Sequence, residues 1–502
     1  MMKTFFTLLL LFFPLLTQAA ETSGVLAEGT KWETRFYIID SGVDGPTVVV
    51  TGGVHGNEPA GFRAAEQIRH WPIASGKLVV VPQVNVLGLR AKTRYLPDAS
   101  DEERDLNRNF PVVDGEAKPR GELATEIWSF VRDQKPDWIL DLHEGYEYNV
   151  SHKPPEGKKK SVGSTIIYFK GEARDPVVER ALEAVNSQIK NPWKRFRPLT
   201  RGPISGSLAR ACATALGAEA MILETTYKEQ PISLRTRQHR AMANVLLNHI
   251  GLIDRDCSNL LTPGREAEQL LVGFFDGPGV GPSGKENIPR IADKAEKIDI
   301  HFLGAADIRP EVLSQFDLLI FPGGSGSKQA KAIGEGREHV REFVETGGGY
   351  LGICAGAYLC SAHYSWSLDL VDSSVFTGSR EIEGVGKKQM WYRGEGARID
   401  LELTEAGSTI FSSVPTEFDV HFQNGPIISP KNAPEIEDYQ ILAWFRSEQV
   451  RWEPQRGTMV DTPAIVSCRF GEGRVISISP HPEKDKALES ILVDSIRWAA
   501  GK

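Results

Sequence analysis

Short apolar runs rich in valine, isoleucine and leucine alternate with longer helix-like stretches along most of this 502-residue chain. In the first half the strand-like runs are residues 46–51, 77–82, 137–142 and 220–223. The helix-like patterns beside them are residues 59–70, 121–133, 176–189 and 233–250. Buried strands that alternate with helices are typical of an α/β domain with a largely parallel sheet.

The alternation stops at a polar stretch, residues 252–268, whose Pro263 and Gly264 are typical of a linker. It starts again with strand-like runs at residues 269–275, 298–303, 317–321, 350–353, 464–468 and 474–478. We expect one helix over residues 327–345 and a terminal helix over residues 485–500. The chain length fits more than one domain, and we predict two α/β domains, at residues 21–251 and 269–502.

The composition excludes several classes of protein. The 58 lysines and arginines against 66 aspartates and glutamates give a formal net charge of −8, so no basic excess indicates nucleic-acid binding. A hydrophobic fraction of 41% excludes wholesale disorder and a polytopic membrane protein. The five cysteines are too few for a disulfide scaffold: they are Cys212, Cys257, Cys354, Cys360 and Cys468. We interpret Cys360 and Cys468 as thiols of the core.

Residues 1–20 have the layout of a secretory signal peptide. Lys3 precedes an apolar run from Phe5 to Leu16, and small residues follow, with cleavage expected after Ala19 or Ala20. The run is too short to span a bilayer comfortably, and the sequence contains no second apolar stretch of spanning length. We therefore expect a periplasmic or secreted protein without a membrane span.

His55 and Glu58 lie in a His-Gly-Asn-Glu motif that follows a strand and opens a helix. Both side chains can face one point from the first helical turn, and imidazole and carboxylate are good zinc ligands. His143 lies at the end of a later strand, and the carboxyl ends of parallel strands share one edge of a sheet. These three residues are therefore candidate ligands of a zinc ion; the alternative is that His55 and Glu58 only cap the helix. Three other histidines lie outside this pattern and are interpreted as surface residues: His70, His152 and His239.

A polar segment between these motifs contains Asn107 and Arg108 in a predicted loop. A guanidinium binds a carboxylate in a bidentate fork, which makes Arg108 a candidate for binding a substrate carboxylate. The alternative is an ordinary surface pair.

The first half of the chain resembles the zinc carboxypeptidases, most closely their succinylglutamate desuccinylase/aspartoacylase branch. The resemblance covers roughly residues 45–250 and is carried by four motifs in the family's order: HGNE at 55–58, RY at 94–95, DLNRNFP at 105–111 and DLHEG at 141–145. It implies a zinc-carboxypeptidase-like fold with a mixed, largely parallel sheet. It also implies one zinc ion held by His55, Glu58 and His143.

The same resemblance implies the roles of four further residues. Arg94 would hold the carbonyl oxygen, Asn107 and Arg108 would clamp the substrate's carboxylate, and Glu224 would be the general base. This set is chemically coherent, because zinc lowers the pKa of a bound water and a carboxylate can then take its proton. An acidic stretch, residues 96–104, lengthens the spacer before Asn107 and is interpreted as a surface loop. Arg90 is the competing candidate for the role implied for Arg94.

A second candidate site lies in the other half of the chain. Cys354 follows an apolar strand and precedes a helix, and the small residues around it permit the sharp turn of a nucleophile elbow. His481 follows a late strand and can act as its base, with Glu483 orienting the imidazole. Backbone N–H groups of residues 321–324 and of Ala355 are candidates for an oxyanion hole.

Residues 269–500 resemble the flavodoxin-like class I glutamine amidotransferase fold, and most closely the domain found at the N-terminus of some biotin–protein ligases. The motifs are FDGPG at 275–279, FPGG at 321–324, GICAGAY at 352–358 and PHPE at 480–483. The resemblance implies a triad of Cys354, His481 and Glu483. Amidotransferases carry glutamine at the position that Tyr358 occupies here, so an active thiol triad and a ligand-binding domain without turnover both remain open.

We predict a zinc-dependent hydrolase that cleaves an amide bond next to a free carboxylate. Its substrate would be a peptide C-terminus or an N-acyl amino acid, with water activated by the metal and Glu224 as base. One alternative is a cysteine-dependent hydrolase or transferase that uses Cys354. Another is a binding protein in which neither site turns over.

Overall fold

The computed structural model describes eight stretches of the chain: residues 19–112, 118–149, 160–172, 174–265, 267–376, 378–389, 396–452 and 457–501. The chain divides into two compact units. Unit 1 comprises Met1–Lys228 and Thr236–Ser258, and unit 2 comprises Glu229–Arg235 and Asn259–Lys502. The predicted signal peptide lies outside the described residues apart from its last two positions.

Unit 1 is built on an eight-stranded sheet of described residues with the strand order β1-β2-β4-β3-β5-β8-β6-β7. The strands are β1 (Ala20–Leu26), β2 (Thr34–Asp40), β3 (Thr47–Gly52), β4 (Lys77–Val81), β5 (Trp138–Gly145), β6 (Thr165–Tyr168), β7 (Arg197–Leu199) and β8 (Glu219–Thr226). The central strands β4, β3, β5 and β8 are parallel. β1 pairs antiparallel with β2, β2 with β4 and β6 with β8, and β7 pairs parallel with β6. The predicted mixed, largely parallel sheet is therefore confirmed.

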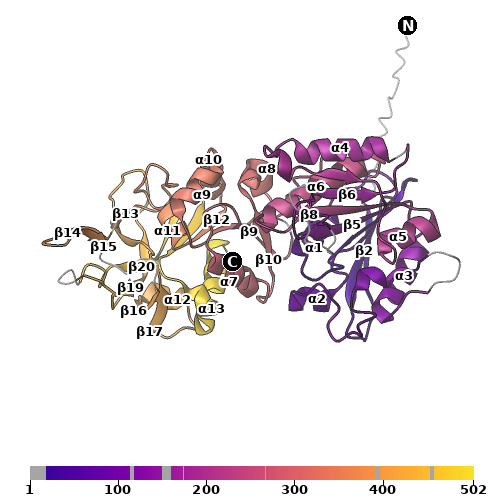
Figure 1. Cartoon of the computed structure of the whole chain (residues 1–502). Helices are drawn as coiled ribbons and strands as arrows, with labels where there is room; N and C mark the ends of the chain where they lie inside the picture. The colour runs from indigo at the N-terminus through magenta and orange to yellow at the C-terminus, as the bar shows by residue number, and fades with distance from the viewer. Residues whose placement is uncertain are drawn as a thin grey trace, which may run out of the picture. The chain divides into compact units, whose positions relative to one another are not determined.

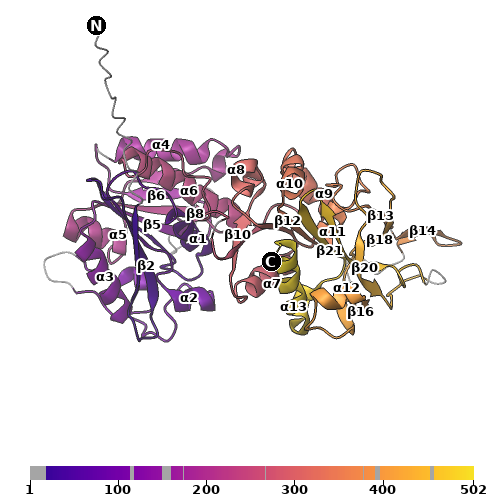
Figure 2. The same cartoon turned by 180° about the vertical axis from the view of Figure 1, so that it is seen from behind.

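Helices cover both faces of this sheet because its central strands are apolar on both sides. The helices of this part of the chain are α1 (Pro59–Ile68), α2 (Val86–Ala91), α3 (Glu122–Gln134), α4 (Asp175–Asn186), α5 (Leu208–Ala211) and α6 (Ile232–His249). Figures 1 and 2 show α3 and α5 on one side of the sheet and α1 and α6 on the other. Side chains of α3 and α5 share a core with alternate residues of β3, β4, β5 and β8.

The parallel pairing aligns the carboxyl ends of β3, β5 and β8. Thr51 of β3 pairs with Asp141 of β5, and His143 of β5 pairs with Glu224 of β8. Side chains that follow or end these strands are therefore delivered to one edge of the sheet.

Close approaches of glycine hold α1 against this edge. Gly61 of α1 lies so near β5 that an added Cβ would meet the carbonyl oxygen of Leu142 at 2.3 Å. Gly52, at the end of β3, would in turn meet the carbonyl oxygen of Gly61 at 2.7 Å. The missing side chains let the helix pack directly on the strand backbones, and this contact sets where the turn before α1 lies.

Unit 2 contains a nine-stranded sheet of described residues with the order β10-β9-β11-β12-β21-β20-β19-β16-β17. Its strands are β9 (Leu270–Phe275), β10 (Ile298–Leu303), β11 (Leu318–Phe321), β12 (Gly349–Ile353), β16 (Ala397–Leu403), β17 (Glu417–Phe422), β19 (Gln440–Phe445), β20 (Pro463–Phe470) and β21 (Gly473–Ile478). The first five in spatial order are parallel and the last four are antiparallel. Two short pairs complete the strands: β13 (Ser373–Phe376) with β18 (Ile427–Pro430), and β14 (Ser379–Ile382) with β15 (Gly386–Gln389). This unit is also α/β, as predicted.

The helices of unit 2 pack on both faces of the parallel strands (Figure 1). They are α7 (Pro282–Ala292), α8 (Pro310–Leu313), α9 (Gly326–Ile333), α10 (Gly336–Glu345), α11 (Ala355–Cys360), α12 (Glu405–Ile410) and α13 (Glu489–Ala499). The prediction of one helix over residues 327–345 is wrong, because Gly334 adopts a φ of 54° that ends α9 before α10 begins. No described helix is long and apolar enough to cross a membrane.

We expect Gly61→Ala to lower the stability of unit 1 by about 1–3 kcal/mol, because its Cβ would overlap the backbone of β5. At an open helical position the same change would stabilise by up to about 1 kcal/mol. Thermal and urea unfolding measure the difference, with Glu126→Ala on the exposed side of α3 as the control. An unchanged or raised unfolding temperature for Gly61→Ala would contradict the close packing.

Candidate metal centre

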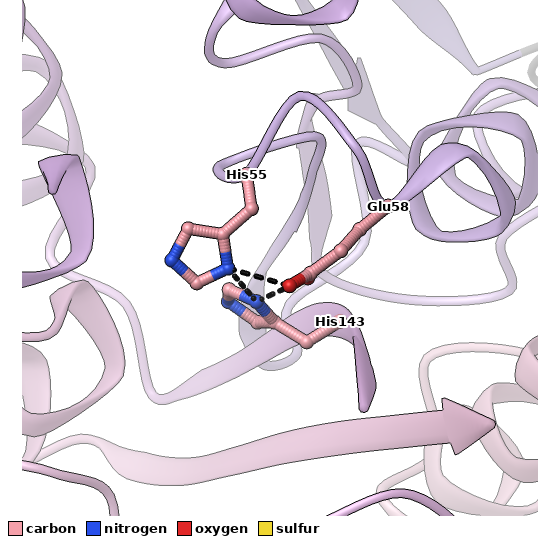
Figure 3. Close-up of side chains that lie close together, drawn as sticks. All are labelled: His55, Glu58 and His143. Atoms are coloured by element: carbon pink, nitrogen blue, oxygen red, sulfur yellow. Dashed lines mark hydrogen bonds and ion pairs between the residues drawn. The ribbon is translucent and has the colours of Figure 1, made fainter. Parts of the chain in front are cut away.

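Three side chains from two segments meet at the carboxyl edge of the unit 1 sheet. His55 lies in the turn after β3, Glu58 is the N-cap residue of α1, and His143 lies near the end of β5. Figure 3 shows the two imidazoles and the carboxylate pointing toward one another. All three are buried, and their candidate ligand atoms lie within 4.8 Å of one another.

The nitrogen that each histidine presents is Nδ1. His55 Nδ1 lies 2.7 Å from Glu58 Oε1, and His143 Nδ1 lies 2.9 Å from Glu58 Oε2. The two Nδ1 atoms are 3.2 Å apart. Two imidazole lone pairs and a carboxylate that converge on one point are a donor set suited to a divalent cation such as zinc, with a further position open to water.

The opposite nitrogen of each imidazole faces a second carboxylate. His55 Nε2 lies 3.2 Å from Asp105, and His143 Nε2 lies 2.9 Å from Asp141, which also accepts a hydrogen bond from the Thr51 hydroxyl. A carboxylate behind each histidine fixes the ring and the tautomer, an arrangement typical of metal-binding histidines.

The charges in this cluster shift the pKa of its members. Burial opposes ionisation of Glu58, but the charges of His55 and His143 outweigh it and hold the Glu58 pKa well below its usual range. Burial also disfavours the charged form of His143, yet Asp141 and Glu58 raise its pKa well above the usual value. The carboxylates thus attract positive charge to the point where the three side chains meet, and a divalent cation supplies such charge.

Glu224 lies opposite His143 in the strand pairing and is also buried. Its Oε2 atom has no hydrogen-bond partner among the described residues. Burial is the main reason that the pKa of Glu224 rises to about 8. A buried carboxyl group with an unused oxygen beside a candidate metal centre is placed to exchange a proton with a bound molecule.

The candidate ligands and Glu224 line one cavity of about 780 Å³ within unit 1. Arg94, Asn107 and Arg108 line the same cavity. Arg94 contacts Glu58 at 3.3 Å and Asp105 at 3.6 Å. Arg90, in the last turn of α2, is exposed and is not among the residues that line this cavity. Of the two competing arginines, Arg94 is therefore the one beside the candidate ligands.

Three acidic residues of this site received no role from the sequence: Asp105, Asp141 and Glu144. Asp141 lies two residues before His143 on a strand, so both side chains share a face; that spacing could have revealed it. Asp105 could not be found in this way, because it reaches His55 across 50 residues from a loop.

The surface interpretation of His239 is wrong: it is fully buried in α6, 3.2 Å from the Thr225 hydroxyl. His152 lies outside the described residues.

In unit 2, Cys354 lies between β12 and α11 with φ 49° and ψ −93°. This strained conformation of a non-glycine residue fits a nucleophile elbow. His481 Nδ1 lies 2.8 Å from Glu483 Oε1. Gly323 packs against both partners, since a Cβ there would lie 2.8 Å from His481 Cε1 and 3.6 Å from Cys354 Cβ.

A backbone carbonyl contacts both the thiol and the imidazole of this pair. The carbonyl oxygen of Gln423 accepts from Cys354 Sγ at 3.5 Å and lies 3.3 Å from His481 Nε2. Burial lowers the pKa of His481, but Cys354 and Glu483 outweigh it and raise the pKa to about 10. Since a carbonyl oxygen can only accept, its contact with Nε2 favours a proton on that nitrogen. Cys360 and Cys468 are buried, as predicted for core thiols.

Comparison with known families finds a matching segment in each half of the chain. Residues 44–152 match the succinylglutamate desuccinylase/aspartoacylase catalytic domain, and residues 310–495 match the biotin-protein ligase N-terminal domain. Unit 1 thus carries a segment of the first family and unit 2 a segment of the second, which confirms the resemblances inferred from the motifs. The first match includes His55, Glu58 and His143, and it ends before Glu224.

Individual relatives cover part of the chain. The N-alpha-acetyl-L-2,4-diaminobutyric acid deacetylase of Halomonas elongata is 33% identical over 108 residues, which are 20% of this chain and 29% of that protein. A structure of mDAP-bound Helicobacter pylori Csd4, a D,L-carboxypeptidase, is 23% identical over 41% of this chain and 51% of that one, with a TM-score of 0.34. The succinylglutamate desuccinylase/aspartoacylase of Rhodobacter sphaeroides is 22% identical over 48% and 68%, with a TM-score of 0.31.

The chain thus spans less than a third of the deacetylase and about half of Csd4.

We expect His143→Ala to lose the divalent metal of the purified protein, because it removes one of three donor atoms. Elemental analysis after dialysis gives the metal-to-protein ratio. His249→Ala, on the exposed end of α6, is the control and should keep the ratio of the unaltered chain. An equal ratio for His143→Ala would show that these three residues do not hold a metal.

Proposed function

We propose that unit 1 is a zinc-dependent hydrolase that cleaves an amide bond next to a free carboxylate. The substrate would be a peptide C-terminus or an N-acyl amino acid. The observation that carries the proposal is the convergence of His55, Glu58 and His143 beside Glu224, whose buried carboxyl group has an oxygen without a hydrogen-bond partner among the described residues.

The donor set supports zinc as the metal. Two histidines and one glutamate with a further open position are a known ligand set of catalytic zinc sites. When bound, zinc supplies Lewis acidity, which lowers the pKa of water and polarises a carbonyl oxygen. Asp105 and Asp141 would hold the imidazoles in orientation throughout.

Glu224 is proposed to be the general base. Glu224 lines the cavity beside the candidate ligands, and a carboxylate so placed can take a proton from water and return it to the leaving nitrogen.

Three further residues are proposed to hold the substrate. Arg94 would donate to the carbonyl oxygen, where negative charge develops during attack. Arg108 would bind the free carboxylate in a bidentate fork, with Asn107 beside it. All three line the cavity that contains Glu224.

We also propose that the protein is exported to the periplasm or the medium, because residues 1–20 have the layout of a secretory signal peptide.

We expect Glu224→Gln to retain zinc and to lose about 10²–10⁴-fold in kcat on carboxypeptidase or deacylase substrates, because glutamine cannot take the proton. Metal analysis and steady-state kinetics measure the two effects separately. Glu219→Gln, at the other end of β8, is the matched control. Near-normal kcat in Glu224→Gln would reject it as the base, and full activity after complete removal of zinc by a chelator would reject the metal mechanism.

A second candidate function is a thiol hydrolase or transferase in unit 2. It is supported by the strained backbone of Cys354 and by the 2.8 Å contact between His481 and Glu483. The carbonyl of Gln423 would have to leave the thiol before a substrate could bind there.

We expect iodoacetamide to modify Cys354 faster than the other four cysteines at neutral pH. Burial raises the pKa of each of the others, and so lowers its thiolate fraction: they are Cys212, Cys257, Cys360 and Cys468. Peptide mapping by mass spectrometry gives the rate at each thiol, and Cys354→Ser should abolish the fast phase. A rate at Cys354 no greater than at the other four would argue for an inert domain.

A further inference from the structure

We propose that Glu144 is a positioning residue for the metal centre and clamps the start of α1 to the strand that carries His143. The proposal rests on the proposed zinc function of unit 1. Glu144 follows His143 directly, is buried, and forms hydrogen bonds to both ends of the Glu58–Ala60 segment. Neither the motifs nor the family match assigns it a role.

The first contact caps the helix. The first backbone N–H groups of a helix have no partner within it. Pro59 has no N–H, and the side chain of Glu58 makes no capping bond. The N–H of Ala60 is therefore the first that needs an acceptor, and it donates to Glu144 Oε1 at 2.6 Å. The cap of α1 thus comes from a different element, the end of β5.

The second contact orients the ligand itself. The backbone N–H of Glu144 donates to Glu58 Oε2 at 3.0 Å. Glu144 thus restrains Glu58 twice: its backbone N–H binds the Glu58 carboxylate, and its side chain caps the first turn of α1, at which Glu58 lies. Both restraints come from one residue of β5, so they fix Glu58 relative to His143.

Successive side chains of a strand point to opposite faces, so β5 can carry a candidate metal ligand on one face and contact α1 on the other. Asp141 and His143 share one face, where they contact each other at 2.9 Å. Leu142 and Glu144 therefore share the other face, toward α1. The close approach of Gly61 to Leu142 confirms that α1 packs there. One strand thus presents a metal ligand on one face and secures the helix that carries another ligand on the opposite face.

The two obvious substitutions separate hydrogen bonding from charge. Glutamine at position 144 keeps a side-chain oxygen that can accept from Ala60, whereas alanine leaves that buried N–H without its acceptor. We expect Glu144→Gln to bind zinc within about threefold of the unaltered chain. We expect Glu144→Ala to bind zinc about 10–100-fold more weakly, the loss typical of removing an outer partner of a metal ligand.

The experiment measures zinc affinity of the apoprotein by competition with a chromophoric chelator, and unfolding temperature of the same samples without metal. Asp175→Ala is the matched control, since Asp175 accepts from the Gly171 N–H at 3.2 Å at the start of α4, away from the candidate ligands. It should lower the unfolding temperature and leave zinc affinity unchanged. A merely structural role of Glu144 would give the same result as this control.

The outcomes distinguish this inference from the function on which it rests. Absence of zinc binding by the unaltered chain would overturn the proposed function. Tight zinc binding by the unaltered chain and by Glu144→Ala alike would overturn only the clamp. Equally weak binding by Glu144→Gln and Glu144→Ala would also overturn it, because the negative charge rather than the hydrogen bond would then be what matters.

Discussion

The in-register parallel pairing of β3, β5 and β8 is the constraint on which the candidate site depends. It places His143 directly beside Glu224, and β3 ends at Gly52, three residues before His55. Backbone hydrogen bonds therefore set the separations between residues that are far apart in sequence, and side chains only complete the geometry. A slip of one residue in β5 would turn His143 away from the site and toward α1, since successive side chains point to opposite faces.

The residues of this site that the sequence predicts lie at the ends of strands or shortly after them. Residues at the carboxyl ends of parallel strands share one edge of a sheet. The meeting of His55, Glu58 and His143 could therefore be inferred from the sequence alone. The role proposed for Glu144 could not be inferred from the sequence, because it depends on which face of β5 is covered by α1 and on the residue at which α1 starts. The choice between Arg94 and Arg90 likewise depended on a helix end, since α2 stops at Lys92 with a φ of 51°.

Glycine explains why the one helix predicted over residues 327–345 is two helices in the structure. Residues 327–345 have a continuous amphipathic pattern, and hydrophobic periodicity alone does not register a break. Gly334 supplies the break because it adopts a positive φ at low cost, and α9 and α10 then pack as separate helices. In the same unit, Gln423 contacts Cys354 from a turn 69 residues away. Such contacts follow from tertiary packing and leave no local pattern in the sequence.

The two candidate centres differ in how their polar groups are satisfied. In unit 1, both imidazoles contact Glu58 through Nδ1, and Glu224 beside them has an oxygen without a hydrogen-bond partner among the described residues. Glu483 Oε2 of unit 2 likewise has no partner in the part of the chain that the structure describes. Burying such groups is costly unless something binds them, so the arrangement in unit 1 favours an ion and a water molecule. In unit 2, the carbonyl of Gln423 already occupies the donor groups of Cys354 and His481. Unit 1 thus gathers two imidazoles and a carboxylate at one point, which a divalent cation would complete, whereas in unit 2 a backbone carbonyl contacts both the thiol and the imidazole.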